Sequence, residues 1–139
     1  MDNDKQKEAV KSAGRGLILV VEDDTFLKNL IVQRLKREGF ETQEAPDGKT
    51  ALEFLKNTTP ILIVLDLLMP GIDGFQVLEE VRKDPRLKGM PVIVLSNLGE
   101  EEHIERAKML GADDYLVKAH FALGEIVEKI NKLIAKRYI

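Results

Sequence analysis

The sequence predicts an α/β fold in which helices cover both faces of a mostly parallel, five-stranded sheet. Three runs of Ile, Leu and Val, at 17–21, 61–65 and 92–95, are wholly apolar, which is typical of strands buried on both faces. Weaker runs at 40–45 and 113–117 complete the five strands, and a helical pattern follows each strand. Short right-handed crossovers then favour a doubly wound parallel sheet.

The first strand, Leu17–Val21, is expected to end on the acids Glu22 and Asp23. Asp24 or Thr25 can cap the helix that follows, because a side-chain oxygen there accepts a bond from the free N–H groups of the first turn. Apolar residues then recur at helical spacing until a glycine stops the helix.

The second strand, Phe40–Ala45, places polar residues between two apolar ends, so it is expected at an edge of the sheet with weak burial. Pro46–Gly48 forms a turn into a helix that ends at Asn57–Pro60. The third strand, Ile61–Leu65, ends on Asp66. An ionised carboxylate after such an apolar run costs free energy unless a cation, hydrogen bonds or water receive it.

The second half of the chain repeats this pattern. Asp73–Gly74 can cap and begin a helix after a Pro-Gly turn. The strand Val92–Leu95 ends on Ser96, a charged helix follows, and the strand Asp113–Val117 ends on Lys118. The C-terminal segment has the strongest amphipathic pattern in the chain and predicts the last helix.

Composition limits the function. With 139 residues and no cysteine, the chain is expected to form one domain without disulfides or thiolate metal sites. The net charge of -3, with both signs spread along the chain, indicates no basic field for nucleic acid or anionic lipid. Residues 1–16 are polar and predict a flexible leader before a domain at 17–139, not a signal peptide or anchor. We therefore expect a cytoplasmic protein that binds neither nucleic acid nor membrane directly.

The residues that end the strands carry acids, a hydroxyl and an amine. They are Glu22, Asp23, Asp66, Ser96 and Lys118. In a doubly wound sheet, ligands bind beyond the carboxyl ends of the strands. Three carboxylates repel one another unless a hard cation lies among them, and oxygen ligands suit Mg²⁺. Lys118 and Ser96 suit phosphate oxygens, and a centrally held Asp66 is the natural nucleophile for an acyl phosphate.

These residues and their neighbours resemble the receiver domains of two-component response regulators, whose fold is flavodoxin-like (CheY-like). The resemblance is carried by Val20–Asp24, Asp66–Gly74, Ser96 and Tyr115–Lys118, and it covers the chain from Leu17 to the C-terminus. It implies the strand order 2-1-3-4-5 in a single-domain regulator.

The resemblance implies that Asp66 accepts a phosphoryl group from a histidine kinase, a histidine phosphotransfer protein or a small donor such as acetyl phosphate. Asp23 and Asp66 would ligate Mg²⁺, with Glu22 contributing through water and Leu68 through its backbone carbonyl. Lys118 would take up charge on the phosphoryl group. The chain would be a phosphoacceptor switch that catalyses only its own phosphorylation and dephosphorylation.

The resemblance also implies an output. Ser96 would swing toward the phosphoryl group, and Tyr115 would turn inward behind it. These movements would change the surface formed by the helix at 100–110, the strand at 113–117 and the last helix. A downstream protein target would bind this surface, and two copies of the chain can pair through it.

Two positions depart from the family. Ala119 follows Lys118 where the family has a proline after a cis bond, and a cis bond before another residue costs ~3-4 kcal/mol, so the last loop is expected to differ or be strained. Asn97 stands where the family has a very small residue, so it would narrow access to the nucleophile or add a hydrogen bond. Leu68 and Leu98 are apolar at positions that look toward the phosphoryl group in the family, which predicts a slowly hydrolysed phosphoaspartate.

Two other functions stay open. A docking module would keep this fold without phosphorylation. A Mg²⁺-dependent phosphohydrolase with an Asp nucleophile, similar to haloacid dehalogenase-like enzymes, would need a second acid two residues after Asp66, where the chain has Leu68.

Overall fold

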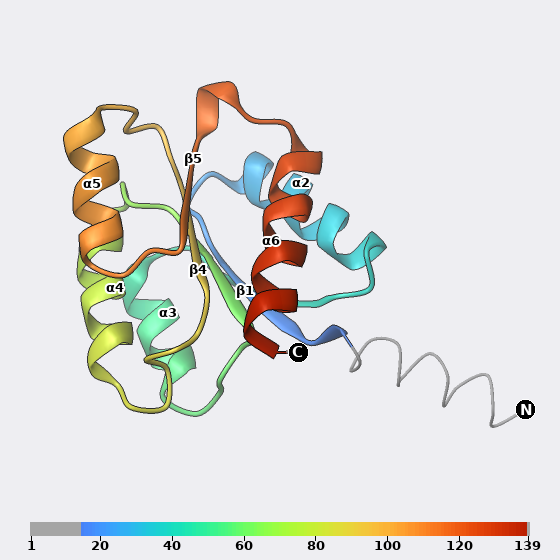
Figure 1. The fold of residues 1–139 in the computed structure, drawn as a ribbon, viewed down its shortest axis with the longest axis horizontal. Helices are drawn as coiled ribbons and strands as arrows, with labels where there is room; N and C mark the ends of the chain where they lie inside the picture. The colour runs from blue at the N-terminus through green and yellow to red at the C-terminus, as the bar shows by residue number, and fades with distance from the viewer. Residues whose placement is uncertain (1–14, 139) are drawn as a thin grey trace, which may run out of the picture.

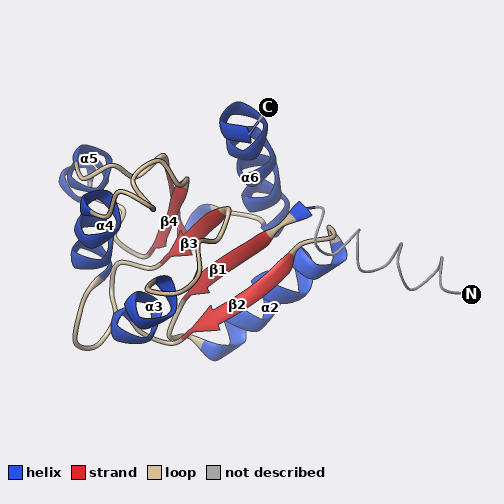
Figure 2. Cartoon of the chain, turned by 90° about the horizontal axis from the view of Figure 1, so that it is seen from below, coloured by secondary structure: helices blue, strands red, loops and turns tan. Residues whose placement is uncertain are grey.

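The computed structural model describes residues 15–138, which form one five-stranded sheet with helices on both faces (Figure 1). The strands are β1 (Leu17–Val21), β2 (Glu41–Ala45), β3 (Leu62–Leu65), β4 (Val92–Ser96) and β5 (Asp114–Val117). The helices are α2 (Thr25–Arg37), α3 (Gly48–Leu55), α4 (Gly74–Lys83), α5 (Glu101–Met109), the short 3-10 helix η1 (Lys118–His120) and α6 (Leu123–Tyr138). All neighbouring strands are parallel and their order is β2-β1-β3-β4-β5, which confirms the expected fold class; Figure 2 shows the first four side by side.

The two faces of the sheet carry separate apolar cores. Helices α3, α4 and α5 cover one face, and α2 and α6 cover the other (Figure 1). Side chains alternate between the faces along each strand, so Leu19 and Val21 point into the first core and Ile18 and Val20 into the second. Burial on both faces explains the uninterrupted apolar runs of β1, β3 and β4.

The edge position of β2 explains its polar composition, since only Ala45 of its residues is buried.

The register of the strands aligns their carboxyl ends. Val21 pairs with both Ala45 and Leu65, and Ser96 pairs with Val117. The residues that follow these strands therefore lie along one edge of the sheet, at the top of Figure 1.

Aspartates fix the starts of three helices. Asp24, rather than Thr25, caps α2, and its carboxylate accepts a hydrogen bond from the Leu27 N–H at 3.1 Å. Asp47 and Asp73 cap α3 and α4 in the same way. Each cap sets a helix N-terminus, with its partial positive charge, at the edge that carries the acids.

Residues 1–14 of the expected leader lie outside the described residues, and the domain boundary at residue 17 stays a prediction. Arg15 contacts the domain, because its guanidinium lies 4.3 Å from the centre of the Phe40 ring and donates to the Glu38 carbonyl at 3.0 Å. Among the described residues, no helix combines the length and the apolar character that crossing a membrane requires.

Candidate functional site

Lys118 lies between two acids at the carboxyl edge of the sheet. Its Nζ atom is 3.0 Å from Asp66 Oδ2, after β3, and 2.7 Å from Glu22 Oε1, after β1. Asp23 completes the group, since one oxygen atom from each of the three carboxylates lies within 4.8 Å of the others. The ends of β1, β3 and β5 thus bring these predicted site residues together.

The two acids that contact Lys118 are almost inaccessible to solvent. Glu22 and Asp66 are each 2% exposed, whereas Asp23 is exposed. Both buried acids continue the ladder of the sheet, because their N–H groups donate to carbonyl oxygens of neighbouring strands at 3.0 Å. The site therefore opens to solvent on the side of Asp23.

Burial dominates the electrostatics of Glu22. It raises the pKa of this carboxyl to about 7, although hydrogen bonds from Lys118 and from the Asp24 N–H act in the opposite direction. Burial by itself lowers the pKa of Lys118, but hydrogen bonds to Glu22 and Asp66 outweigh it and raise that pKa, so the amine stays protonated. Within the described site, three carboxylates face one ammonium group and leave an excess of negative charge.

This donor set fits a hard divalent cation. Carboxylate oxygens are the ligands that Mg²⁺ and Ca²⁺ take in proteins. Glu22 Oε1 is buried and, although it contacts the Lys118 amine, it accepts no directed hydrogen bond from the described residues. The Leu68 N–H donates to Asp66 Oδ1 at 3.2 Å, so the backbone at this residue borders the cluster. The residues present can therefore bind a metal ion.

The N-terminus of α4 packs directly against the Asp66 segment. The Gly74 N–H donates to the Leu67 carbonyl at 3.0 Å, and a Cβ atom on Gly74 would lie 2.6 Å from Leu67 Cα. Any side chain at this position would push the helix or the acidic segment out of place. Sequence reasoning identified Gly74 only as a helix start, because a close approach of two backbones leaves no pattern along the chain.

Ser96 and Tyr115 both bind the loop after β4. Ser96 is fully buried, and its Oγ atom accepts a hydrogen bond from the Leu98 N–H at 3.3 Å. The Tyr115 hydroxyl donates a hydrogen bond to the carbonyl oxygen of Leu98. The two residues predicted to act as a switch therefore hold both backbone polar groups of Leu98.

The loop after β5 replaces the family's proline turn with η1. All peptide bonds of the described residues are trans, and within them only glycines have a positive φ. The backbone around Ala119 therefore shows no strain of that kind, and Lys118 reaches both acids without the proline. Asn97, the other departure, is exposed.

Glu22 is expected to make the stability of the metal-free domain depend on pH. The pKa of Glu22 rises from 4.5 to about 7 on folding, so between these pH values the folded protein holds a proton that the unfolded chain has released. The free energy of unfolding therefore falls as the pH rises from 4.5 to about 7. E22Q should gain stability relative to wild type across that window. Urea unfolding in EDTA at several pH values measures this difference, and a difference independent of pH would contradict the prediction.

The family model described as the response regulator receiver domain matches residues 18–131. The "Probable transcriptional regulator ycf27" of Galdieria sulphuraria is 38% identical over 136 residues, covering 98% of this chain and 49% of the relative. The "DNA-binding dual master transcriptional regulator RpaA" of Synechocystis sp. is 34% identical over 119 residues, covering 86% of this chain and 49% of the relative. The chain spans about half the length of the curated relatives it matches.

The names of these relatives contradict the expectation that this protein has no direct nucleic-acid partner. RpaA is named as DNA-binding, and ycf27 as a transcriptional regulator. The expectation was wrong because the net charge of -3 describes only these 139 residues. These residues match only about half of each relative, and their net charge gives no information on nucleic-acid contacts that the other half of the relative makes.

Several solved structures share the fold, and two of them are receiver-family proteins with 33% and 34% identity. The receiver domain of the Francisella response regulator 1452 has a TM-score of 0.80 and 33% identity, and the match covers 87% of this chain and 98% of that chain. TrrA from Thermotoga maritima, solved in complex with Mg²⁺-BeF, has a TM-score of 0.74 and 34% identity over 84% of this chain and 97% of that chain. With a family model that matches most of its length, the chain belongs to the response regulator receiver domain family.

Proposed function

We propose that this domain, at residues 17–139, is the phosphoryl-accepting switch of a two-component system. Asp66 accepts the phosphoryl group of a phosphohistidine on a histidine kinase or a histidine phosphotransfer protein. The observation that carries the proposal is the 3.0 Å contact between the Lys118 amine and Asp66, with two further acids in the same small site. An ammonium group in that place can bind a phosphoryl oxygen once Asp66 has received the group.

In the transfer, a carboxylate oxygen of Asp66 forms the new bond to phosphorus. The bond from phosphorus to the donor imidazole breaks, and its electron pair leaves with the imidazole nitrogen. Lys118 turns from its ion pair toward the transferred oxygens and stabilises their charge. The chain catalyses only its own phosphorylation and dephosphorylation.

Mg²⁺ is the proposed metal, and when bound it neutralises further charge on the phosphoryl group. The groups that would hold it are Asp23, Asp66, Glu22 through water and the backbone carbonyl of Leu68. The acidic oxygen cluster supports this assignment, and so does the Mg²⁺-BeF complex of the related TrrA.

The signal passes from the site to the surface through Leu98. When Ser96 turns its hydroxyl toward the phosphoryl group, the Leu98 N–H loses its acceptor, and the loop keeps the bond from the Tyr115 hydroxyl. Tyr115 follows the loop inward, and the surface formed by α5, β5 and α6 changes. This surface controls a partner or region that acts on DNA, a proposal supported by the names of the relatives.

Incubation with acetyl phosphate and Mg²⁺, followed by mass spectrometry of the intact protein, tests the proposal. Wild type should gain one phosphoryl group and Asp66→Asn none, and beryllofluoride should change the NMR spectrum of wild type alone. No change that depends on Asp66 would favour the docking module. Repeated turnover of phosphate monoesters would favour the phosphohydrolase.

Phe26 is expected to contact a protein phosphodonor. Its side chain is 75% exposed in the first turn of α2, directly after the acids that follow β1, and Leu30 is exposed one turn further on. An exposed aromatic side chain beside a reactive group is a typical anchor for a partner. We expect Phe26→Ala to slow transfer from a histidine phosphotransfer protein about tenfold and to leave phosphorylation by acetyl phosphate unchanged. Met109→Ala, 87% exposed on α5, is the control, and equal losses with both donors would refute the role.

Leu68 is expected to protect the phosphoaspartate from water. Its side chain is 50% exposed, and its N–H already binds Asp66. An apolar group beside the phosphoryl group hinders an attacking water molecule, whereas an amide can bind one. Leu68→Asn should therefore shorten the lifetime of phosphorylated protein several-fold, as measured by loss of radiolabelled phosphate. A lifetime equal to that of wild type would remove Leu68 from this role.

A further inference from the structure

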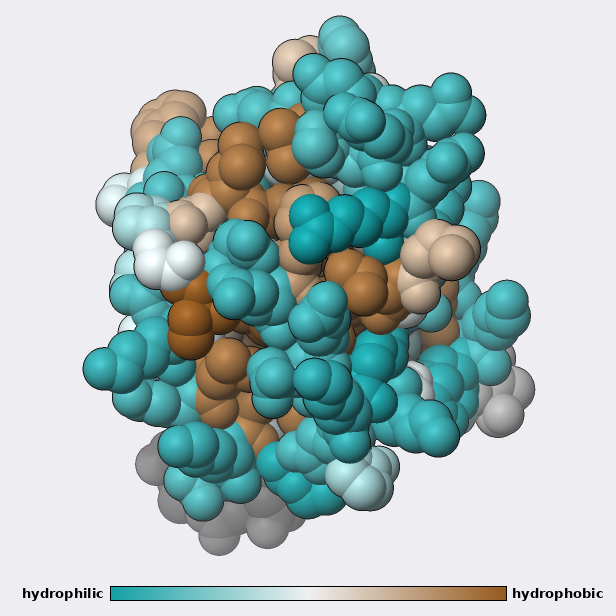
Figure 3. Space-filling view, turned by 90° about the vertical axis from the view of Figure 1, so that its left-hand side faces the viewer, coloured by the Kyte–Doolittle hydropathy of each residue, from teal (hydrophilic) through white to brown (hydrophobic). Residues whose placement is uncertain are grey.

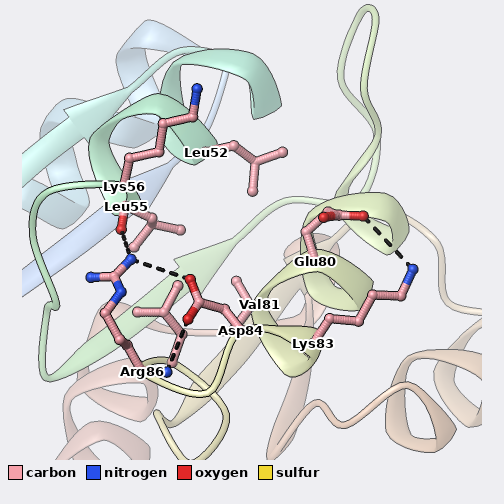
Figure 4. A pocket seen from close by; sticks show the side chains of 9 residues that line it. Leu52, Leu55, Lys56, Glu80, Val81, Lys83, Asp84 and Arg86 are labelled. Carbon is pink, nitrogen blue, oxygen red and sulfur yellow. Dashed lines mark hydrogen bonds and ion pairs between the residues drawn. The ribbon is translucent and has the colours of Figure 1, made fainter.

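A groove lies between α3 and α4, away from the acidic site. It has a volume of about 610 Å³, and its walls are the C-terminal turns of both helices and the loop after α4 (Figure 4). Both helices run from the acidic edge toward the opposite edge of the sheet, so the groove opens at the far end of the domain. A ligand there would leave the approach to Asp66 free.

The base of this groove is apolar. Leu55, Val81 and Leu87 form it and are almost fully buried, and Leu52 is partly exposed above them. Figure 4 shows the Leu52 side chain extending from α3 toward the space beside α4. Two parallel helix walls with a leucine between them form a cradle for apolar side chains at helical spacing.

Three cations and two acids line the groove, so its lining carries a small net positive charge, and two of the cations are available to a ligand. The cations are Lys56, Lys83 and Arg86, and the acids are Glu80 and Asp84. Arg86 is anchored, since it donates to the Leu55 carbonyl at 2.6 Å and to Asp84 at 3.2 Å. Lys83 lies 3.8 Å from Glu80, but both side chains are more than half exposed, so this pair is weak. Lys56 is exposed and pairs with no carboxylate within residues 15–138.

The groove lies at the basic edge of the domain. Lys or Arg side chains occupy the last turns of α2, α4, α5 and α6, while aspartates cap α2, α3 and α4 at the other edge. An acidic ligand is therefore repelled from the edge that carries Asp66 and attracted to the groove. This difference in charge between the two edges of the domain favours an acidic partner over a basic or neutral one at the groove.

We propose that this groove docks an acidic amphipathic helix of a partner protein. Apolar side chains of that helix contact Leu52 and the base of the groove. Carboxylates beside them pair with Lys56 on one wall and Lys83 on the other. The site is independent of phosphorylation at Asp66.

Amide NMR of the full isotope-labelled chain tests this proposal with two synthetic helical peptides. Both carry Leu at positions i, i+4 and i+7; one has Glu at the flanking positions and the other has Lys. We expect the Glu peptide to shift amide signals of the groove residues and to bind about tenfold more tightly than the Lys peptide. K56E/K83E should reverse that order. The matched control K36E/K132E, which changes exposed lysines on α2 and α6, should keep it.

Three results would overturn the proposal. They are equal binding of the two peptides, shifts centred outside the groove, and no binding of the Glu peptide up to about 1 mM. Analytical ultracentrifugation without peptide tests for a different occupant of the groove. If wild type forms a dimer and K56E/K83E is a monomer, the groove binds a second copy of the chain and not a helix of another protein.

Discussion

Replacing Lys118 by alanine is expected to slow phosphoryl acceptance by Asp66 about 100-fold and to lower the free energy of unfolding of the metal-free protein by about 3 kcal/mol. The amine lies 3.0 Å from Asp66 Oδ2 and 2.7 Å from Glu22 Oε1, and both acids are 2% exposed. Without it, two buried carboxylates repel each other and the transferred phosphoryl oxygens lose their ammonium partner.

The rate of phosphorylation by acetyl phosphate and urea unfolding with and without Mg²⁺ measure these two effects. Mg²⁺ should restore part of the stability, because a cation again lies among the acids, but it should not restore the rate. Lys129→Ala is the matched control. Its amine contacts Asp114 at 2.9 Å, but both side chains are 31% exposed, so its loss should cost under about 1 kcal/mol. If K118A accepts phosphate at the wild-type rate, the amine does not contact the phosphoryl group.

Arg82→Ala is expected to lower the free energy of unfolding by about 3–5 kcal/mol, because this guanidinium joins three segments. It donates to the Gly111 carbonyl at 3.1 and 2.7 Å, to the Lys88 and Met90 carbonyls at 2.9 and 2.8 Å, and to Asp113 Oδ2 at 3.2 Å. The Arg82 side chain is only 19% exposed. Alanine would leave these acceptors without a donor from α4.

Thermal and urea unfolding measure the effect of Arg82→Ala. Arg82→Lys should recover only a small part of the loss, since a single ammonium cannot reproduce the fork of donors that reaches both the 88–90 and the 111–113 segments. Arg86→Ala is the control, because that side chain is 45% exposed and donates only to the Leu55 carbonyl, Asp84 and, at 3.4 Å, the Thr59 hydroxyl among the described residues. A loss for Arg82→Ala no larger than for Arg86→Ala would show that the network adds little stability.

Much of the fold could be predicted from local patterns. The apolar runs that became β1, β3 and β4 are buried on both faces, as their composition predicted. The boundaries moved by a residue or so, since β2 begins at Glu41 and not Phe40, and β3 at Leu62 and not Ile61. Strand ends depend on where the neighbouring strand stops pairing, and a single sequence does not contain that information.

The acids of the cluster and Lys118 were also predictable as candidates, because acids and a lysine directly follow predicted strands. Their proximity depended on the strand order, and the resemblance to receiver domains supplied that order. The contacts of Gly74 with Leu67, of Tyr115 with the loop carbonyl of Leu98 and of Arg82 with the Gly111 turn had no such signal. Each contact involves backbone atoms, which every residue carries, so no residue type marks it in the sequence.

The sequence by itself determined the α/β class, the buried strands and the residue types at the strand ends, because burial and turn chemistry act over a few neighbouring residues. Only the tertiary structure decided that Lys118 lies between Glu22 and Asp66, and that burial raises the pKa of Glu22 to about 7. Distances and desolvation depend on which segments pack together in space, and that arrangement exists only once the sheet has formed.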